Sequence, residues 1–202
     1  MIFDLFPTAI SINEISIQAN ELDCLLRLAN DREHFIKNNN GNFYHEENYV
    51  LDTVLKDSKL ARDIARYIDE YTANVLGEDP SLRYTQSWIN INPPGTSHHK
   101  HSHINSIISG VLYLQTNENS GKFLVHKREE RTIKNQTKNL NKYNYSYLFF
   151  EPRKFDLYLF PSSLEHSVEE NKSDENRISL SFNTFYHGTI NAFSSLTELR
   201  IN

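Results

Sequence analysis

The sequence predicts a mainly β fold, an antiparallel sandwich or barrel, with helices packed beside it. After Pro80 the chain divides into short runs rich in aromatic and β-branched residues, separated by turn signals such as Pro93-Pro94-Gly95. Before Pro80 the apolar residues instead recur every three or four positions, the period of an amphipathic helix. The 202 residues, 38% of them hydrophobic, suit one domain with its own core.

Two helices are expected in the first third of the chain. The segment Leu55–Leu76 carries one apolar stripe. Asp57 or Ser58 could cap its start, and Gly77 suits a left-handed C-cap. The segment Gln18–Lys37 is expected to form the other helix, and an asparagine-rich turn separates the two.

Six strands and one long loop are expected in the rest of the chain. The polar segment Lys127–Asn144 indicates a surface loop or lid. We therefore expect a single domain, residues 1–202, with helical support in 1–80, a β core in 81–188 and a tail in 189–202. The expected strands are Tyr84–Asn92, Ile107–Gln115, Lys122–His126, Tyr145–Glu151, Phe155–Phe160 and Ile178–Tyr186.

Composition excludes several classes of protein. A net charge of −5, from 21 basic and 26 acidic residues, lacks the positive field of a general nucleic-acid binder. The single cysteine, Cys24, allows neither an internal disulfide nor a cysteine-based zinc site. The sequence contains no run of about 18 apolar residues, the length needed to span a membrane. The start of the chain lacks the basic region of a signal peptide. We expect a soluble, cytoplasmic protein.

A histidine cluster is the first candidate for chemistry: His98, His99, His101 and His103 lie within six positions. Imidazole is the commonest protein ligand for metal ions because it offers a neutral nitrogen donor near neutral pH. On a strand, residues two apart point to the same face, so His101 and His103 could reach one ion. The alternative is a histidine-rich surface turn, and His98 and His99 are expected to be loop residues.

The C-terminal half supplies possible partners for this cluster. His166 follows a strand that breaks at a proline. Further on, Arg177, Ser179, Ser181 and Asn183 alternate with apolar residues and therefore share one strand face. Such a face would be a poor core, because a buried guanidinium needs a partner, but a good pocket wall. Arginine with serine two residues on can bind a carboxylate; the alternative is the solvent face of an edge strand.

These segments resemble the Fe(II)- and 2-oxoglutarate-dependent oxygenase superfamily and, within it, a bacterial and phage branch with an HxH in place of the usual HxD. The resemblance covers about residues 84–187. Its specificity comes from the ordered spacing, with Gly95 six positions before His101 and Arg177 eleven after His166. The segments that carry it are Trp88–Asn92, Gly95, His101-Ser-His103, Ser109–Leu114, Gly121, Phe160–His166 and Arg177–Asn183.

The resemblance implies a double-stranded β-helix, a jelly roll of the cupin type, with a metal ion in its open mouth. It further implies roles for six residues and for no other catalytic group. The implied metal ligands are His101, His103 and His166, and the implied co-substrate contacts are Arg177, Ser179 and Tyr113. Asn90 and Asn92, which share one strand face, are weaker candidates for a co-substrate contact.

His103 departs from the superfamily pattern, in which this position is Asp or Glu. A neutral imidazole leaves the ferrous site about one unit more positive than a carboxylate would. Three readings stay open: His103 is a third ligand, or it swings away and leaves two ligands, or the metal is zinc or copper.

The implied activity is an oxygenase that uses Fe(II), 2-oxoglutarate and O2 to oxidise a substrate, releasing succinate and CO2. The basic segment Lys127–Asn144 would then serve as the lid that excludes water. Two alternatives stay open: a three-histidine cupin-type dioxygenase without 2-oxoglutarate, and a non-catalytic module that binds metal or carboxylate. The substrate is not encoded in a readable feature, and exposed strand edges permit a homodimer.

Overall fold

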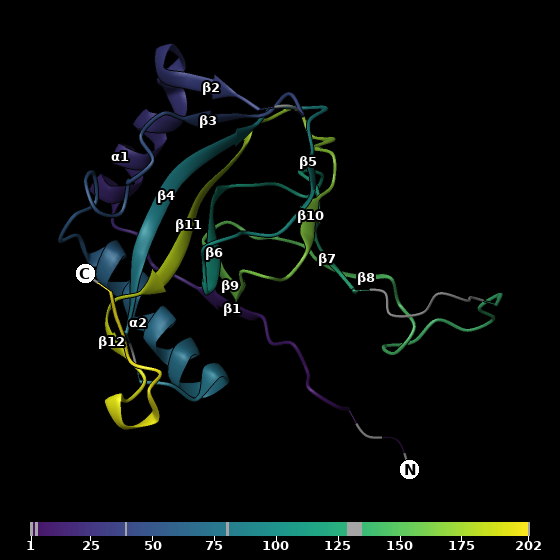
Figure 1. The fold of residues 1–202 in the computed structure, drawn as a ribbon. Helices are drawn as coiled ribbons and strands as arrows, with labels where there is room; N and C mark the ends of the chain where they lie inside the picture. The colour runs from purple at the N-terminus through teal and green to yellow at the C-terminus, as the bar shows by residue number, and fades with distance from the viewer. Residues whose placement is uncertain (1, 3, 39, 80, 129–134, 202) are drawn as a thin grey trace.

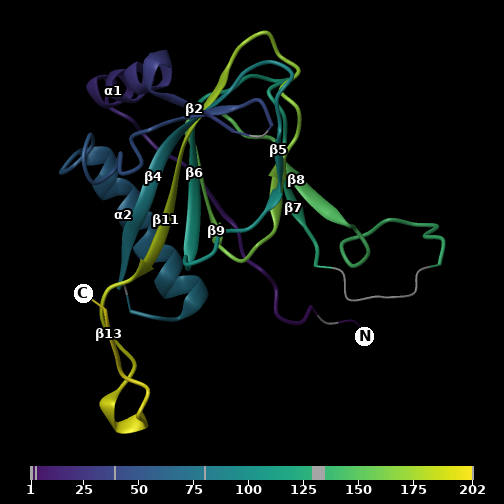
Figure 2. The same ribbon diagram turned by 45° about the horizontal axis from the view of Figure 1, so that its top comes forward.

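The structure, a computed structural model, describes residues 2, 4–38, 40–79, 81–128 and 135–201. Its elements form three layers: helices, a seven-stranded antiparallel sheet, and a four-stranded sheet on the other side (Figure 1, Figure 2). This arrangement is a double-stranded β-helix, so the predicted fold class is confirmed. None of the described helices is long and apolar enough to cross a bilayer.

The two sheets contain all six strands that the sequence predicts, together with shorter ones. In the large sheet the order is β1 (Ser11–Glu14), β9 (Asp156–Pro161), β6 (Ile108–Gln115), β11 (Arg177–Tyr186), β4 (Leu82–Asn92), β3 (Phe43–His45) and β2 (Phe35–Lys37). In the small sheet the order is β5 (His98–His101), β10 (His166–Val168), β7 (Phe123–His126) and β8 (Tyr147–Phe150).

The helices cover the outer face of the large sheet. Helix α2 (Lys59–Tyr71) begins where the side chain of Ser58 accepts a hydrogen bond from the amide of Ala61. A wider turn, η2 (Thr72–Leu76), continues it to Gly77, whose φ of 70° confirms the predicted left-handed C-cap. The prediction that this helix begins at Leu55 was wrong, because residues 50–57 form turns.

Helix α1 (Ala19–Asn30) is shorter than predicted. After a 3-10 turn, η1 (Arg32–His34), the segment 35–37 pairs with β3 as strand β2. The prediction of a helix to Lys37 was therefore wrong, because pairing with β3 in a hairpin at the edge of the large sheet overrides the local helical pattern. Strands β1, β2 and β3 also show that the first 80 residues are not helical support alone, since they extend both edges of the large sheet.

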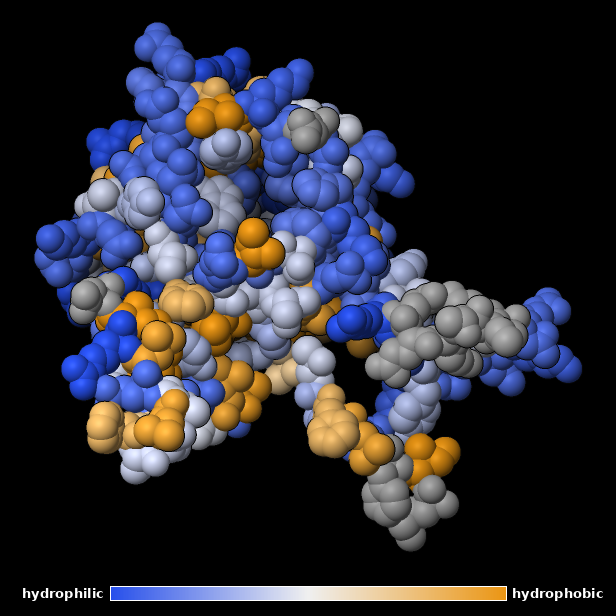
Figure 3. All heavy atoms as spheres, viewed as in Figure 1, coloured by the Kyte–Doolittle hydropathy of each residue, from blue (hydrophilic) through white to orange (hydrophobic). Residues whose placement is uncertain are grey.

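The last residues, predicted as a tail, include a small hairpin. Strands β12 (Gly188–Ile190) and β13 (Leu199–Ile201) flank a 3-10 turn, η3 (Phe193–Ser195). Phe193 and Leu196 are 75% and 90% exposed. Figure 3 shows apolar side chains at the lower left, where the hairpin lies in Figure 1. The hairpin is separate from the cavity described below.

Side chains that alternate along the strands of the large sheet point to two different regions, the apolar core under the helices and the space between the two sheets. On β11, Ile178, Leu180 and Phe182 pack toward the helices in the main apolar core. Gly110 of β6 leaves room for the ring of Phe182, because a Cβ at that glycine would meet the ring at 2.1 Å. The opposite face, between the sheets, holds a smaller aromatic cluster and a polar cavity. Its apolar members are Val111, Tyr113, Phe123, Tyr158 and Phe160.

Candidate metal centre

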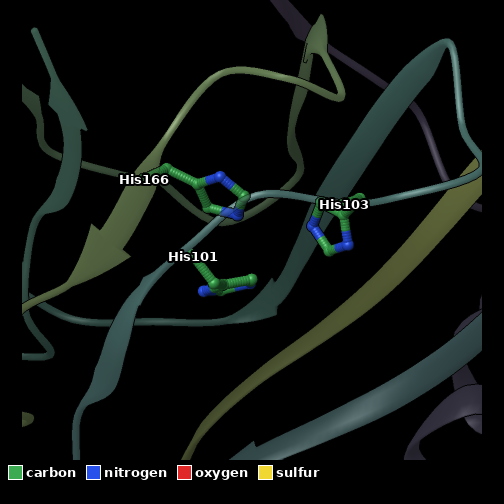
Figure 4. A group of neighbouring side chains, drawn as sticks. All are labelled: His101, His103 and His166. Carbon is green, nitrogen blue, oxygen red and sulfur yellow. The ribbon is translucent and has the colours of Figure 1, made fainter. Parts of the chain in front are cut away.

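Three histidines from two parts of the chain meet between the two sheets. His101 ends β5 and His166 begins β10, and these two residues are direct cross-strand partners. Their ring centroids are 4.4 Å apart, and His103 lies 5.1 Å from each of them. One nitrogen from each ring lies within 4.8 Å of the others, and the rings converge in Figure 4. The spacing is that of a group able to hold one metal ion.

The hydrogen bonds of two rings leave a lone pair free for a metal. Nδ1 of His101 donates to the carbonyl of His99 at 2.8 Å, and Nδ1 of His166 donates to the carbonyl of Leu164 at 2.9 Å. Because the neutral ring carries one proton, Nε2 is then unprotonated in both. A ligating histidine is typically held in this way by its other nitrogen.

His103 reaches the group by a different route from the one predicted. Strand β5 ends at His101, so alternation along a strand does not aim His103. Its backbone amide instead donates to the carbonyl of Ser162 at 2.8 Å, which draws residue 103 toward the end of β9. No hydrogen bond from the described residues fixes its ring, and its tautomer is open.

Burial keeps these imidazoles neutral. Loss of hydration lowers the pKa of His166 to about 3 and that of His103 to about 4, and it also lowers the pKa of His101. His98 behaves in the same way, with a pKa lowered to about 3 by burial and by the nearby charge of Arg177. The prediction that His98 and His99 lie in a loop was wrong, since both are on β5 and line the cavity.

Arg177 is buried beside the histidines without a counter-ion. Only 2% of the residue is exposed, and no carboxylate of the described chain lies within ion-pair distance. Its Nη1 donates to the carbonyl of Ser120 at 2.5 Å, whereas Nη2 has no partner among the described residues. A buried guanidinium in this state needs an anion.

Gly121 makes room for this arginine. Its φ is 92°, and a Cβ there would lie 2.4 Å from the carbonyl oxygen of Glu169 and 3.0 Å from Nη1 of Arg177. Only glycine fits this approach without displacing its neighbours.

The cavity between the sheets has a volume of about 390 Å³. Ser179 and Tyr113 line it beside Arg177, as does Asn90, whose amide donates to Ser181 and accepts from the indole of Trp88. Burial raises the pKa of Tyr113, so the phenol stays protonated. None of the described acidic residues lines the cavity. All six predicted site residues are therefore brought to one place.

The long loop does not cover this cavity. Its described parts, residues 127–128 and 135–144, extend away from the small sheet beyond β7 and β8 (Figure 1), and none of them lines the cavity. The lid prediction is wrong for these residues. The segment 129–134, which includes Arg131 and Lys134, lies outside the described residues.

A second group of possible ligands lies elsewhere. Asp31, His34 and His45 also have side-chain nitrogen and oxygen atoms within 4.8 Å of one another. Nδ1 of His45, however, accepts the backbone amide of Glu47, so its Nε2 carries the proton and has no lone pair for a metal. The group is therefore a poor metal site.

The donors of the first group fit a ferrous ion with a dicarboxylate. Two imidazoles present free lone pairs, a third neutral ring stands beside them, and Nη2 of Arg177 lacks an acceptor. Imidazole suits iron among the divalent metals, and a guanidinium suits a carboxylate.

Comparison with known proteins agrees with this geometry. Residues 86–183 match a family described as "Putative 2OG-Fe(II) oxygenase". No curated protein matches the sequence. The structure resembles a 2OG-Fe(II) oxygenase family oxidoreductase from Burkholderia pseudomallei, with 12% identity, 88% of this chain and 84% of that chain covered, and a TM-score of 0.59.

Two hydroxylases are also similar. A prolyl-4-hydroxylase from Pseudomonas putida is 16% identical, with 90% of this chain and 94% of that chain covered and a TM-score of 0.56. A prolyl hydroxylase from Trichoplax adhaerens is 14% identical, with 88% and 83% covered and a TM-score of 0.61. At these identities the likeness establishes the fold, while the matched family segment contains the three histidines and Arg177. Residues 86–183, which contain all six predicted site residues, match the Fe(II)- and 2-oxoglutarate-dependent oxygenase family, and the chain has the fold of such oxygenases.

Proposed function

We propose that the protein oxidises its substrate with Fe(II), 2-oxoglutarate and O2, and that the six predicted site residues bind the metal and the co-substrate. One observation carries the proposal: the buried, unpaired guanidinium of Arg177 shares a cavity with three neutral imidazoles. A metal site alone has no need of a buried cation, whereas a ligand that chelates the metal and ends in a carboxylate needs both.

The metal would be held by Nε2 of His101 and of His166, with His103 as the third ligand. When bound with 2-oxoglutarate, the ferrous ion supplies the activation of O2 that yields succinate, CO2 and an oxidised substrate. The protein's own contribution is to hold the ligand rings in one tautomer through the carbonyls of His99 and Leu164.

The remaining residues orient the co-substrate and keep the site dry. Arg177 would bind the far carboxylate, with the hydroxyl of Ser179 and the protonated phenol of Tyr113 close by. Phe123 and Phe160 form an apolar wall against the ring of His166, with centroids 5.4 and 4.8 Å from it. Excluding water strengthens the charged contacts inside the cavity.

The buried arginine also weighs against the alternatives. A three-histidine dioxygenase without 2-oxoglutarate would leave Nη2 of Arg177 unpaired unless its own substrate were an anion. A non-catalytic module that binds a metal or a carboxylate would need either the free lone pairs or the buried guanidinium, whereas this cavity holds both.

Anaerobic absorbance tests the proposal. A weak visible charge-transfer band should appear when Fe(II) and 2-oxoglutarate are both added, because it arises only when the keto acid chelates iron. Arg177→Ala should need about a hundredfold more 2-oxoglutarate to reach the same band, at unchanged iron content, because it loses charged hydrogen bonds. Arg153→Ala, which removes an exposed arginine outside the cavity, should titrate as the wild type does. A wild-type protein that gives no band would refute the proposal.

Two further predictions stay open. A ferrous centre and a lone free cysteine both favour a reducing compartment, which supports the cytoplasm. Strand β8 is an edge strand whose Tyr147, Leu148 and Phe149 are exposed, which supports a homodimer through that edge.

A further inference from the structure

Four buried side-chain atoms of the described chain have no hydrogen-bond partner, and two of them belong to one cavity. These two are Nη2 of Arg177 and Nδ2 of Asn92, and both are donors. Asn92 is 1% exposed. A buried donor without an acceptor costs free energy, so each one observed in a folded protein calls for an explanation.

Register places the two donors side by side. Arg177 of β11 and Asn92 of β4 are direct cross-strand partners in the large sheet, and both side chains lie on the cavity face. The backbone of Asn92 is fixed as well, because the side-chain amide of Asn171 donates to its carbonyl at 2.8 Å. Two neighbouring donors on a fixed backbone are suited to one ligand group with two acceptor atoms.

The adjacent asparagine shows that the unpaired amide is specific to residue 92. Asn90 lies two positions away on the same strand face. Its Nδ2 donates to Ser181 at 2.8 Å and its Oδ1 accepts from Trp88 at 3.2 Å, so the amide is satisfied within the protein. The sequence therefore contains two asparagines in similar positions, of which one is used internally and one is left for a ligand.

We propose that Asn92 is a specificity-determining residue that donates from Nδ2 to the same carboxylate that Arg177 binds. The inference rests on the proposed function, in which that carboxylate is the far end of 2-oxoglutarate. A carboxylate is planar and has two oxygens, so it accepts from the guanidinium and the amide together. None of the described acidic residues lines the cavity, so no described carboxylate competes for this pair.

The pairing also explains why the second donor is an amide. An aspartate in its place would form an ion pair with Arg177 across the two strands and satisfy the guanidinium without any ligand. An amide adds a hydrogen bond and leaves the positive charge available. In Asn92→Asp the new carboxylate should therefore pair with Arg177 in place of the ligand, while the shape of the side chain is kept.

Calorimetric titration of metal-free protein with glutarate tests this inference without iron or turnover. Glutarate carries the two carboxylates of 2-oxoglutarate but lacks the keto group, so it reports on the carboxylate subsite alone. We expect Asn92→Ala to weaken glutarate binding about tenfold and Asn92→Asp to weaken it about a hundredfold. Asn183→Ala, the control, removes an asparagine of β11 that does not line the cavity, and it should stay within about twofold. The concentration of 2-oxoglutarate that half-saturates the Fe(II) band should shift by the same factors.

Each outcome bears on the inference. Glutarate affinities of Asn92→Ala and Asn92→Asp equal to that of the wild type would overturn it, as would an equal loss in Asn183→Ala. If Asn92→Ala does not fold, the glutarate affinity of the isosteric Asn92→Asp decides the matter alone. A wild-type protein that forms the Fe(II) band while Asn92 variants bind normally refutes only the inference. A wild-type protein that forms no band refutes the proposed function instead.

Discussion

The two histidine groups of this protein lie on opposite faces of the large sheet and are prepared for different partners. His101, His103 and His166 face the cavity between the sheets, whereas His45 follows the cavity-lining Tyr44 on β3 and so points the other way. Both groups bring three potential ligand residues within 4.8 Å of one another. Proximity alone therefore does not distinguish them.

The difference lies in the hydrogen bonds of the rings. In the cavity group, His101 and His166 donate from Nδ1 to backbone carbonyls and keep Nε2 unprotonated. In the outer group, Nδ1 of His45 accepts a backbone amide, and its Nε2 has no hydrogen-bond partner among the described residues. Asp31 instead accepts from Nδ1 of His34, so the outer group contains a carboxylate, while the cavity group has none. A histidine cluster becomes a metal site when its second nitrogens are used elsewhere.

The largest difference between the two groups is expected when one histidine ring is removed from each and iron binding is measured. His166→Ala should lower iron affinity at least about a hundredfold, because losing a ligand exceeds the effect of losing an outer hydrogen bond. His45→Ala should leave iron affinity unchanged and lower the free energy of unfolding by about 1–2 kcal/mol, since it leaves the amide of Glu47 unpaired. Metal analysis after dialysis checks both; an equal loss of iron in the two variants would contradict the distinction.

A substitution at Gly121 tests the part of the cavity where Arg177 would bind a carboxylate. Gly121→Ala should lower the free energy of unfolding by about 3 kcal/mol, because a Cβ meets the carbonyl of Glu169 and φ is positive. It should also weaken 2-oxoglutarate binding, because the same Cβ presses on Arg177. Gly188→Ala is the control: its φ of 76° is also positive but no atom lies within 4 Å, so it should cost about 1 kcal/mol and leave binding unchanged. Urea denaturation and calorimetry measure the two effects.

His103 is the member of the cavity group that the hydrogen bonds do not fix. His103→Ala should therefore lower iron occupancy severalfold, a smaller loss than that of His166→Ala. His103→Asp should restore occupancy, because a carboxylate is a metal ligand at this position elsewhere in the superfamily. Undiminished iron in His103→Ala would mean that two histidines suffice.

The smallest expected effect is on the pH dependence of stability in metal-free protein, where the two groups should act with opposite sign. Burial depresses the pKa of His98 to about 3, so the unfolded state binds more protons below pH 6.5 and stability falls as pH falls toward 3. The bond to Asp31 raises the pKa of His34, so its contribution is present below pH 6.5 and is lost as pH rises through the folded pKa.

His98→Gln should therefore flatten the loss of stability between pH 7 and pH 5, and His34→Gln should steepen it. Denaturant midpoints at the two pH values provide the measurement. Parallel slopes for the two variants would mean that the cavity does not hold His98 neutral.

Local patterns in the sequence predicted four strands of the large sheet, β4, β6, β9 and β11, but not β1, β2 or β3. The alternation of Arg177 and Ser179 with apolar neighbours predicted that the two share one face, either a pocket wall or the solvent face of an edge strand, and the structure shows the pocket wall. A strand of ten residues carries enough periodicity to be read from the sequence alone.

Short elements and long-range contacts could not be predicted in this way. Strands β5 and β10 have four and three residues, too few for a period, so His98 was assigned to a loop. The position of His103 depends on the carbonyl of Ser162, and the amide of Asn90 is satisfied by Ser181 and Trp88, whereas Nδ2 of Asn92 finds no partner in the described chain. Such distinctions depend on which neighbours the fold supplies.

The pairing of β5 with β10 has a consequence for how the molecule stays folded. Strand β5 is the outer strand of the small sheet, and β10 is its only strand neighbour in that sheet. A metal ion bound by both His101 and His166 would cross-link the two strands and close a loop of the chain between these residues. Removing iron should then loosen the rim of the barrel first, so that amide hydrogens on β5 exchange with solvent sooner than those on β11.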